Sequence, residues 1–205
     1  MSLVYESKVP TSYRNDFVKK VREVSTRLGI DPNWLMAIMY WESARSFSPS
    51  IQNSIGATGL IQFIPSTARG LGTTTTALKN MSAVDQLDYV EKYFNVYKGK
   101  LNSYVDTYFA VFFPLAIGKP DDWVIQGGGI LASQIAKQNP AFDVNKDSKV
   151  QVWEVKKVML EKLPREWIND GSFGLAIKSY KGYLTVGLLL IAIGGLYIYK
   201  NVRRK

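Results

Sequence analysis

Apolar residues recur at helical spacing near the start of the chain. Between residues 11 and 28 they fall every three or four positions, and Gly29 follows as a typical C-terminal cap. Asp31 and Pro32 are a typical N-cap and first helical residue, so the pattern predicts a second helix over residues 32–44.

Similar patterns predict four more helices, at residues 82–97, 104–113, 128–138 and 152–163. Two segments between the helices are rich in Gly, Ser, Thr and Pro and predict loops or short hairpins, at residues 46–67 and 71–79. The expected fold class is therefore mainly α with little strand.

The pattern changes near the C-terminus, where residues 183–199 carry no charged side chain. As a helix this segment would be about 26 Å long, close to the roughly 30 Å of a bilayer's hydrocarbon core. Tyr183 and Tyr199 lie at its ends, and Lys181 and Lys200 flank it. We expect a single transmembrane helix here, with a buried core helix as the alternative.

The formal net charge of +9 does not select a partner. Much of the excess lies in the basic tail, residues 200–205. A mildly basic remainder suits phospholipid headgroups, an anionic cell-wall polymer or a nucleic-acid backbone equally well. We therefore predict no specific nucleic-acid partner.

The absence of cysteine and histidine excludes several chemistries. Disulfides, thiolate nucleophiles, Ser-His-Asp triads and Cys/His zinc sites are all impossible. Acid–base catalysis near neutral pH must use a carboxylate, a lysine or a tyrosine.

Glu42 is the only acidic residue in the predicted helix over 32–44. The negative end of the helix dipole and the neighbouring aromatic residues both disfavour its charged form, which suits a general acid. Glycoside cleavage is a reaction that often uses such a glutamate. A surface glutamate in a last helical turn is the alternative.

Two sequence motifs begin at Glu42 and follow one another along the chain, ESARSFSP at residues 42–49 and GATGLIQFIPSTA at residues 56–68. They resemble the lysozyme-like lytic transglycosylases, peptidoglycan-cleaving enzymes with motifs E-S-x-F-x-P and G-x-x-G-L-x-Q-x-x-P-x-T-A. The resemblance is close over residues 31–69 and looser to about residue 125. It implies a lysozyme-like α+β fold with little strand.

The resemblance also implies roles for individual residues. Glu42 matches the single catalytic acid, and the expected substrate-binding residues are Ser43, Gly59, Leu60, Gln62 and Tyr108. The glycines permit a tight turn where side chains would obstruct a sugar, and the glutamine amide can bind an acetamido group.

The implied reaction uses the Glu42 carboxyl group twice. It protonates the glycosidic oxygen between N-acetylmuramic acid and N-acetylglucosamine, then takes the proton of the muramoyl C6 hydroxyl as a 1,6-anhydro ring closes. A hydrolytic muramidase ordinarily needs a second carboxylate, and none lies between Glu42 and Asp85. The lyase is favoured, and the hydrolase stays open.

One departure concerns a third motif of the family, A-Y-N-A-G, whose tyrosine contacts the catalytic acid. Phe112 stands where that tyrosine is expected. Tyr108 lies one helical turn earlier and is the expected substitute, with packing in an aromatic helix as its alternative role. The departure keeps open a non-catalytic structural or glycan-binding protein with the same fold.

A group of oxygen-bearing residues between positions 143 and 154 resembles the calcium loop of an EF-hand. Its candidate ligands are Asp143, Asn145, Asp147, Lys149 through its carbonyl group, Gln151 and Glu154. Ser148 stands where glycine is usual, so a left-handed turn there would be strained. We expect a weak, structural Ca²⁺ site, with a solvated turn as the alternative and a calcium sensor as a more distant one.

The expected organisation is a transglycosylase domain at residues 1–125, a helical subdomain at 126–168, a linker at 169–182, the membrane helix and the basic tail. The N-terminus has no apolar signal segment. We therefore predict a single-pass protein in the internal membrane of a bacteriophage particle, opening the cell wall during genome entry. A tail anchor whose orientation does not follow the rule for basic flanking residues is the alternative. Its expected partners are peptidoglycan strands, the lipid bilayer and virion proteins.

Overall fold

The computed structural model describes residues 1–169. No helix within this part of the chain is long and apolar enough to cross a membrane. The predicted span at 183–199, the basic tail and residues 170–182 of the predicted linker lie outside the described residues.

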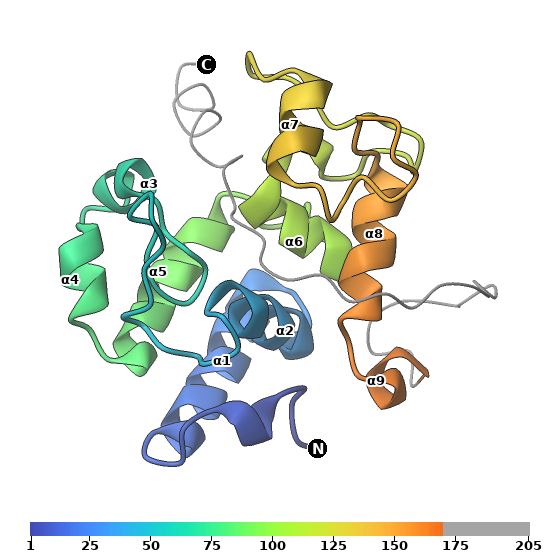
Figure 1. The fold of residues 1–205 in the computed structure, drawn as a ribbon. Helices are drawn as coiled ribbons and strands as arrows, with labels where there is room; N and C mark the ends of the chain where they lie inside the picture. Colours follow the sequence, from blue (N-terminus) through green and yellow to red (C-terminus); the bar gives the residue numbers. More distant parts are fainter. Residues whose placement is uncertain (170–205) are drawn as a thin grey trace. The chain divides into compact units, whose positions relative to one another are not determined.

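The described residues form two compact units, Met1–Asn102 and residues 103–169. The first contains η1 (Glu6–Lys8), α1 (Arg14–Leu28), α2 (Pro32–Glu42), α3 (Pro65–Gly70), α4 (Thr75–Lys79) and α5 (Ala83–Asn95) (Figure 1). The second contains α6 (Tyr104–Phe112), η2 (Pro114–Ala116), α7 (Ala132–Gln138), α8 (Val152–Glu161) and α9 (Arg165–Asn169). Isolated bridges are the only β pairing in these residues, which confirms the mainly helical fold class. The predicted domain limit at residue 125 stays a prediction.

The predicted helix ends are largely confirmed by their caps. Gly29 ends α1 with a φ of 73°. The Asp31 carboxylate accepts a hydrogen bond from the Asn33 N–H at 2.8 Å, and the Ser82 hydroxyl accepts one from the Asp85 N–H at 3.0 Å. Local side chain–backbone bonds of this kind fix where α2 and α5 begin.

Three differences from the predicted elements have local causes. α2 ends at Glu42 because Ala44 and Arg45 leave the helical region, with φ of 50° and 68°. α7 begins only at Ala132 because residues 127–129 have positive φ and form a turn. The segment predicted as a loop at 71–79 contains α4, since Thr74 caps it.

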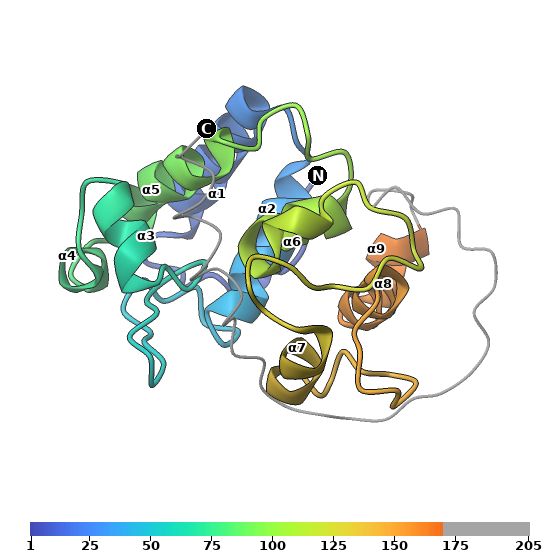
Figure 2. The same cartoon turned by 90° about the horizontal axis from the view of Figure 1, so that it is seen from above.

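The core of the first unit lies between α1, α2 and α5. α1 packs along α5 and also contacts α2, as Figure 2 shows. The middle of α2 is fully buried, from Leu35 to Met39. The last residue of this helix, Glu42, is half-buried at the end of the core.

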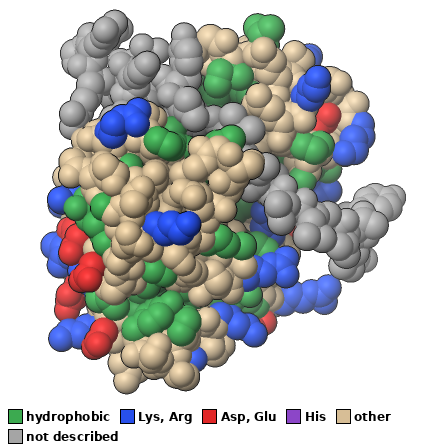
Figure 3. Space-filling view, turned by 60° about the vertical axis from the view of Figure 1, so that its left-hand side comes forward, with side chains coloured by type: hydrophobic (Ala, Val, Ile, Leu, Met, Phe, Trp, Pro, Cys, Tyr) green, Lys and Arg blue, Asp and Glu red, His purple; other side chains and the backbone are tan. Residues whose placement is uncertain are grey.

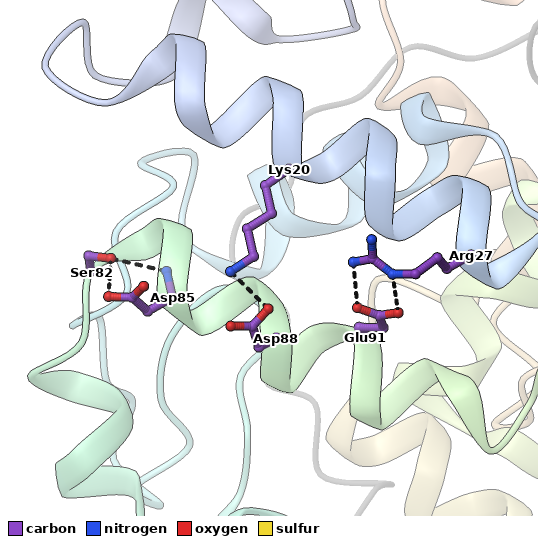
Figure 4. A network of polar contacts seen from close by, with 6 residues as sticks. All are labelled: Lys20, Arg27, Ser82, Asp85, Asp88 and Glu91. Atoms are coloured by element: carbon purple, nitrogen blue, oxygen red, sulfur yellow. Dashed lines mark hydrogen bonds and ion pairs between the residues drawn. The ribbon is translucent and has the colours of Figure 1, made fainter.

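Ion pairs join α1 to α5 at the edge of this core (Figure 4). Lys20 Nζ lies 2.8 Å from Asp88, and the Arg27 guanidinium bonds both oxygens of Glu91 at 2.6 and 2.8 Å. The hydrogen bond from Arg27 lowers the pKa of the Glu91 carboxyl group. These contacts fix the register of the two helices.

The N-terminal segment packs on α2. The Val4 N–H donates to the Asn33 side-chain oxygen at 2.9 Å in a buried position. The Tyr5 ring stacks on Tyr40 with centroids 4.0 Å apart, and Tyr5 has a φ of 57°. The segment is therefore part of the first unit's core, held on the helix that carries Glu42.

In the second unit, α6 packs against α8. The rings of Phe112 and Phe142 lie 4.9 Å apart and are buried. The Ile125 N–H donates to the Val150 carbonyl at 2.7 Å, which ties the segment before α7 to the segment before α8. The loop over 143–154 is thereby attached to a folded core.

The molecular face in Figure 3 is dominated by uncharged polar groups and backbone, with hydrophobic side chains in separate patches. Acidic side chains gather at one edge of this face beside Lys and Arg.

Candidate active site

The turn after Glu42 has an unusual backbone. Ala44, Arg45 and Phe47 have φ of 50°, 68° and 52°, in the left-handed region that residues other than glycine seldom occupy. Such conformations cost free energy and cluster at functional sites. This strain lies directly beside the predicted catalytic acid.

Hydrogen bonds hold the turn in this conformation. The Arg45 N–H donates to the Tyr40 carbonyl at 2.6 Å, and the Phe47 N–H donates to the Ser43 hydroxyl oxygen at 2.8 Å. The Tyr13 hydroxyl donates to the Phe47 carbonyl at 3.1 Å. Because the bonds come from the N-cap residue of α1, from α2 and from within the turn, the turn is fixed relative to Glu42.

Ser43 was predicted to bind substrate. Its side chain has no exposed surface, and its hydroxyl group is used within the turn. The geometry therefore favours a positioning role, in which Ser43 holds the backbone that follows Glu42.

The second motif forms a short hairpin, as predicted. Thr58 and Phe63 exchange two backbone hydrogen bonds, of 3.0 and 2.8 Å, and Gln52 pairs with Thr58 on the other side. Gln62 lies in the turn of this hairpin with a φ of 53°. Its side chain is half-buried and donates to the Gly59 carbonyl at 3.2 Å. The remaining amide capacity of Gln62 suits the predicted contact with a sugar.

Gly59 and Leu60 have a structural explanation beside the predicted one. The fully buried Gln86 accepts the Leu60 N–H at 2.7 Å and donates to the carbonyl groups of Pro49 and Leu78 at 3.1 and 2.9 Å. A Cβ atom on Gly59 would lie 2.2 Å from the Gln86 side-chain oxygen. Gly59 therefore makes room for Gln86, and Leu60 is fully buried.

Tyr108 lies on α6, in the second unit. Its side chain is 3% exposed and its ring is nearly parallel to that of Phe112, with centroids 5.8 Å apart. It also contacts Phe142 edge-on at 6.1 Å. Packing in an aromatic helix is thus observed, and substrate binding by Tyr108 stays a prediction.

The predicted calcium loop folds around its own backbone. Asp143 accepts hydrogen bonds from the N–H groups of Asp147 and Ser148 at 3.1 and 3.2 Å, and Asn145 accepts a second bond from Asp147. Ser148 adopts the expected left-handed conformation, with a φ of 64°. The side chains of Asp143 and Asn145 therefore fix the backbone of this loop.

The buried residue of this loop is Glu154, which has no exposed surface. Its Oε1 atom accepts hydrogen bonds from the N–H groups of Val144 and Asn145 at 2.8 and 3.1 Å, and its Oε2 atom accepts one from the Gln151 N–H at 2.8 Å. Glu154 thereby caps α8 and closes the loop. No group of three or more acidic, His or Cys side chains within residues 1–169 is arranged to hold a metal ion. The oxygens of the loop fit a cation by type, and the Ca²⁺ site through Lys149 and Gln151 stays a prediction.

Two functional features were not found from the sequence. Gln86 is separated by 26 positions from Leu60, and an isolated glutamine in an amphipathic helix gives no signal of such a role. The strained turn has one signal in the sequence, the spacing between Glu42 and Phe47. Phe47 follows Glu42 by five positions, whereas the phenylalanine of the motif E-S-x-F-x-P follows its glutamate by three. This difference in length marks where the chain departs from the motif.

The two hairpin glycines give a matched test of the role of Gln86. Gly59→Ala should lower the free energy of unfolding by about 3–5 kcal/mol, because strain and a clash with Gln86 add together. Gly56→Ala has a similar φ, 78° against 83°, but its Cβ would meet only Pro65 at 3.7 Å. It should cost about 1–2 kcal/mol. Equal losses in urea unfolding would show that Gln86 does not require Gly59.

Comparison with known families agrees with this site. Residues 19–112 match the family model described as "Transglycosylase SLT domain". The match begins within α1, contains both motif strings and ends at Phe112. No curated protein and no solved structure matches the chain significantly. Residues 19–112 of this chain are therefore similar to the transglycosylase domain family.

Proposed function

We propose that the protein is a lytic transglycosylase that cleaves peptidoglycan with Glu42 as its single acid and base. The family match supports peptidoglycan as the substrate class. The observation that carries the proposal is the placement of Glu42, half-buried at the end of the buried helix α2 and next to a strained turn that hydrogen bonds hold in place.

The proposed reaction conserves the proton that Glu42 carries. The protonated carboxyl group donates to the glycosidic oxygen, and the bond from that oxygen to C1 of N-acetylmuramic acid breaks. The C6 hydroxyl oxygen of the same sugar bonds to C1, and its proton passes to the Glu42 carboxylate. The product is a 1,6-anhydro sugar, no water is consumed, and the enzyme is ready for another cycle.

The state of the acidic residues on α5 supports this single-carboxylate mechanism. The Asp85 carboxylate accepts a hydrogen bond from the Ser82 hydroxyl group at 2.7 Å. Asp88 forms an ion pair with Lys20, and Glu91 forms one with Arg27 (Figure 4). These carboxylates are engaged in helix capping and in helix packing. A hydrolase mechanism would need one of them, or a carboxylate of the second unit, beside the scissile bond.

A non-catalytic glycan-binding protein is the second candidate, and Phe112 is the observation that favours it. Phe112 is buried between Tyr108 and Phe142. A phenyl ring cannot hydrogen-bond a catalytic carboxyl group, so the contact expected from the family's third motif is missing at this position. Turnover by the wild-type protein decides between the two candidates.

We further propose that residues 183–199 anchor the enzyme in a bilayer. The proposal rests on the uncharged run of residues and its flanking Tyr and Lys side chains. Opening of the cell wall during phage genome entry would suit a wall enzyme that arrives with a membrane. Association with virion proteins and the phage membrane are part of this proposal.

Replacement of Glu42 tests the catalytic proposal. Glu42→Gln keeps the size and hydrogen bonding of the side chain but has no proton to donate, so clearing of a peptidoglycan suspension should slow by several orders of magnitude. Glu23→Gln removes an exposed acid from α1 and should leave the rate unchanged. Clearing by the Glu42 variant at the wild-type rate would exclude Glu42 as the acid.

Calcium binding is tested by thermal unfolding. A ligand that binds only the folded state adds about 2.7 kcal/mol at one hundred times its Kd, so a chelator should lower the melting temperature of the wild-type protein. Asp143→Asn should abolish the difference between chelator and excess Ca²⁺. Superimposable wild-type melting curves in the two conditions would leave the solvated turn as the explanation of the loop.

Flotation with lipid vesicles tests the membrane anchor. The full chain should float with vesicles in high salt, because burial of an apolar helix is insensitive to ionic strength. Truncation after Gly171 should abolish flotation and preserve cleavage of isolated peptidoglycan. Flotation of the truncated protein in high salt would place the membrane contact elsewhere in the chain.

A further inference from the structure

Arg45 occupies the segment in which this chain departs from the transglycosylase motif. The segment from Glu42 to Phe47 is two residues longer than in E-S-x-F-x-P. Ala44 and Arg45 are exposed and left-handed within it. Neither residue type relieves the strain of this conformation, as glycine or asparagine would. The strain at Arg45 is therefore maintained by its surroundings.

The guanidinium of Arg45 has a defined place. Its central carbon lies 4.7 Å from the centroid of the Trp41 ring. Trp41 is the residue directly before Glu42 in the sequence. Its backbone N–H is fixed at 2.6 Å from the Tyr40 carbonyl. No carboxylate within residues 1–169 forms an ion pair with Arg45. A fixed positive charge thus lies beside the candidate active site, without a partner of opposite charge in the described chain.

Trp41 is held in turn by the N-terminal segment. Tyr40 contacts the Trp41 ring at 5.5 Å, and Tyr5 contacts it edge-on at 6.3 Å. Tyr5 precedes the part of the chain that matches the family model, residues 19–112. Residues outside the matched segment therefore contribute to the support of Arg45.

Stacking on an aromatic ring leaves Arg45 able to bind an anion. The Arg45 guanidinium carbon lies over the Trp41 ring, and a guanidinium carries its five N–H donors around the edge of its plane. That edge fits a carboxylate with two parallel hydrogen bonds. In peptidoglycan the glycan backbone with its amide-linked lactyl groups is uncharged, and the carboxylates are carried by the peptide stems on N-acetylmuramic acid.

We propose that Arg45 binds a carboxylate of the peptide stem on the sugar that occupies the site beside Glu42. The inference rests on the proposed transglycosylase function and adds a determinant of substrate choice to it. Arg45 makes the contact with substrate, and Trp41, Tyr5 and Tyr40 position it. The enzyme then prefers glycan strands that carry stems with free carboxylates.

The test compares two soluble substrates with the full chain. One is uncross-linked glycan strands with peptide stems, and the other is the same strands after their stem carboxylates are coupled to methylamine. Arg45→Gln should raise KM about tenfold on the first substrate, with kcat near the wild-type value. On the amidated strands the variant and the wild type should have the same KM.

Two variants provide the controls. Arg45→Lys keeps the charge but loses the flat, forked donor, so its KM on stem-bearing strands should lie between those of the wild type and Arg45→Gln. Lys98→Gln removes one charge from an exposed position after α5 and should change neither KM. Salt should raise the wild-type KM on stem-bearing strands more than on amidated strands, which checks the proposal without any substitution.

Two results would overturn the proposal. An equal rise of KM on both substrates would assign Arg45 to the glycan or to the fold, and an unchanged KM on stem-bearing strands would exclude it from binding. Failure of the wild-type protein to cleave either substrate would instead contradict the proposed function, so the two failures are distinguishable.

Discussion

The candidate site depends on one buried amide, that of Gln86. The segment between α2 and α3 contains almost no regular structure, so its backbone polar groups need partners from elsewhere. Gln86 supplies two of them, at Pro49 and Leu60, and it also donates to the Leu78 carbonyl of α4. Its own helix, α5, packs on α1. A small change at Gln86 or at Gly59 would therefore move the whole hairpin.

The second constraint is the strained turn after Glu42. Its left-handed residues cost free energy, and bonds from Ser43 and Tyr13 retain them. The result is an abrupt end to α2 at Glu42, with the carboxyl group of that residue at the margin of the core. The hydrogen bonds of the turn hold the backbone that follows Glu42 in a fixed conformation.

The sequence predicted the features that depend on neighbours in the chain. Asp31 and Ser82 cap their helices through residues two and three positions away, and both caps were expected. The left-handed turn at Ser148 followed in the same way from the spacing of the loop. Glu42 is at the end of α2 as expected, and its role as the catalytic acid stays a prediction.

The features that the sequence did not predict depend on distant residues. Gln86 meets Pro49 across 37 positions, and Tyr5 meets Tyr40 through the folding of the N-terminal segment onto α2. The left-handed conformation of Arg45 is likewise imposed by Tyr40 and by the turn, because arginine has no preference for it. Such contacts become visible only when the helices are packed.

The central claim is that one carboxyl group, on Glu42, completes the reaction without water. Mass spectrometry of muropeptides released by the wild-type protein tests it directly. A lytic transglycosylase leaves 1,6-anhydro-N-acetylmuramic acid at the new ends, lighter by one water than a hydrolysed end, and we expect these to be the product. New reducing ends that take up ¹⁸O from labelled water would contradict the claim.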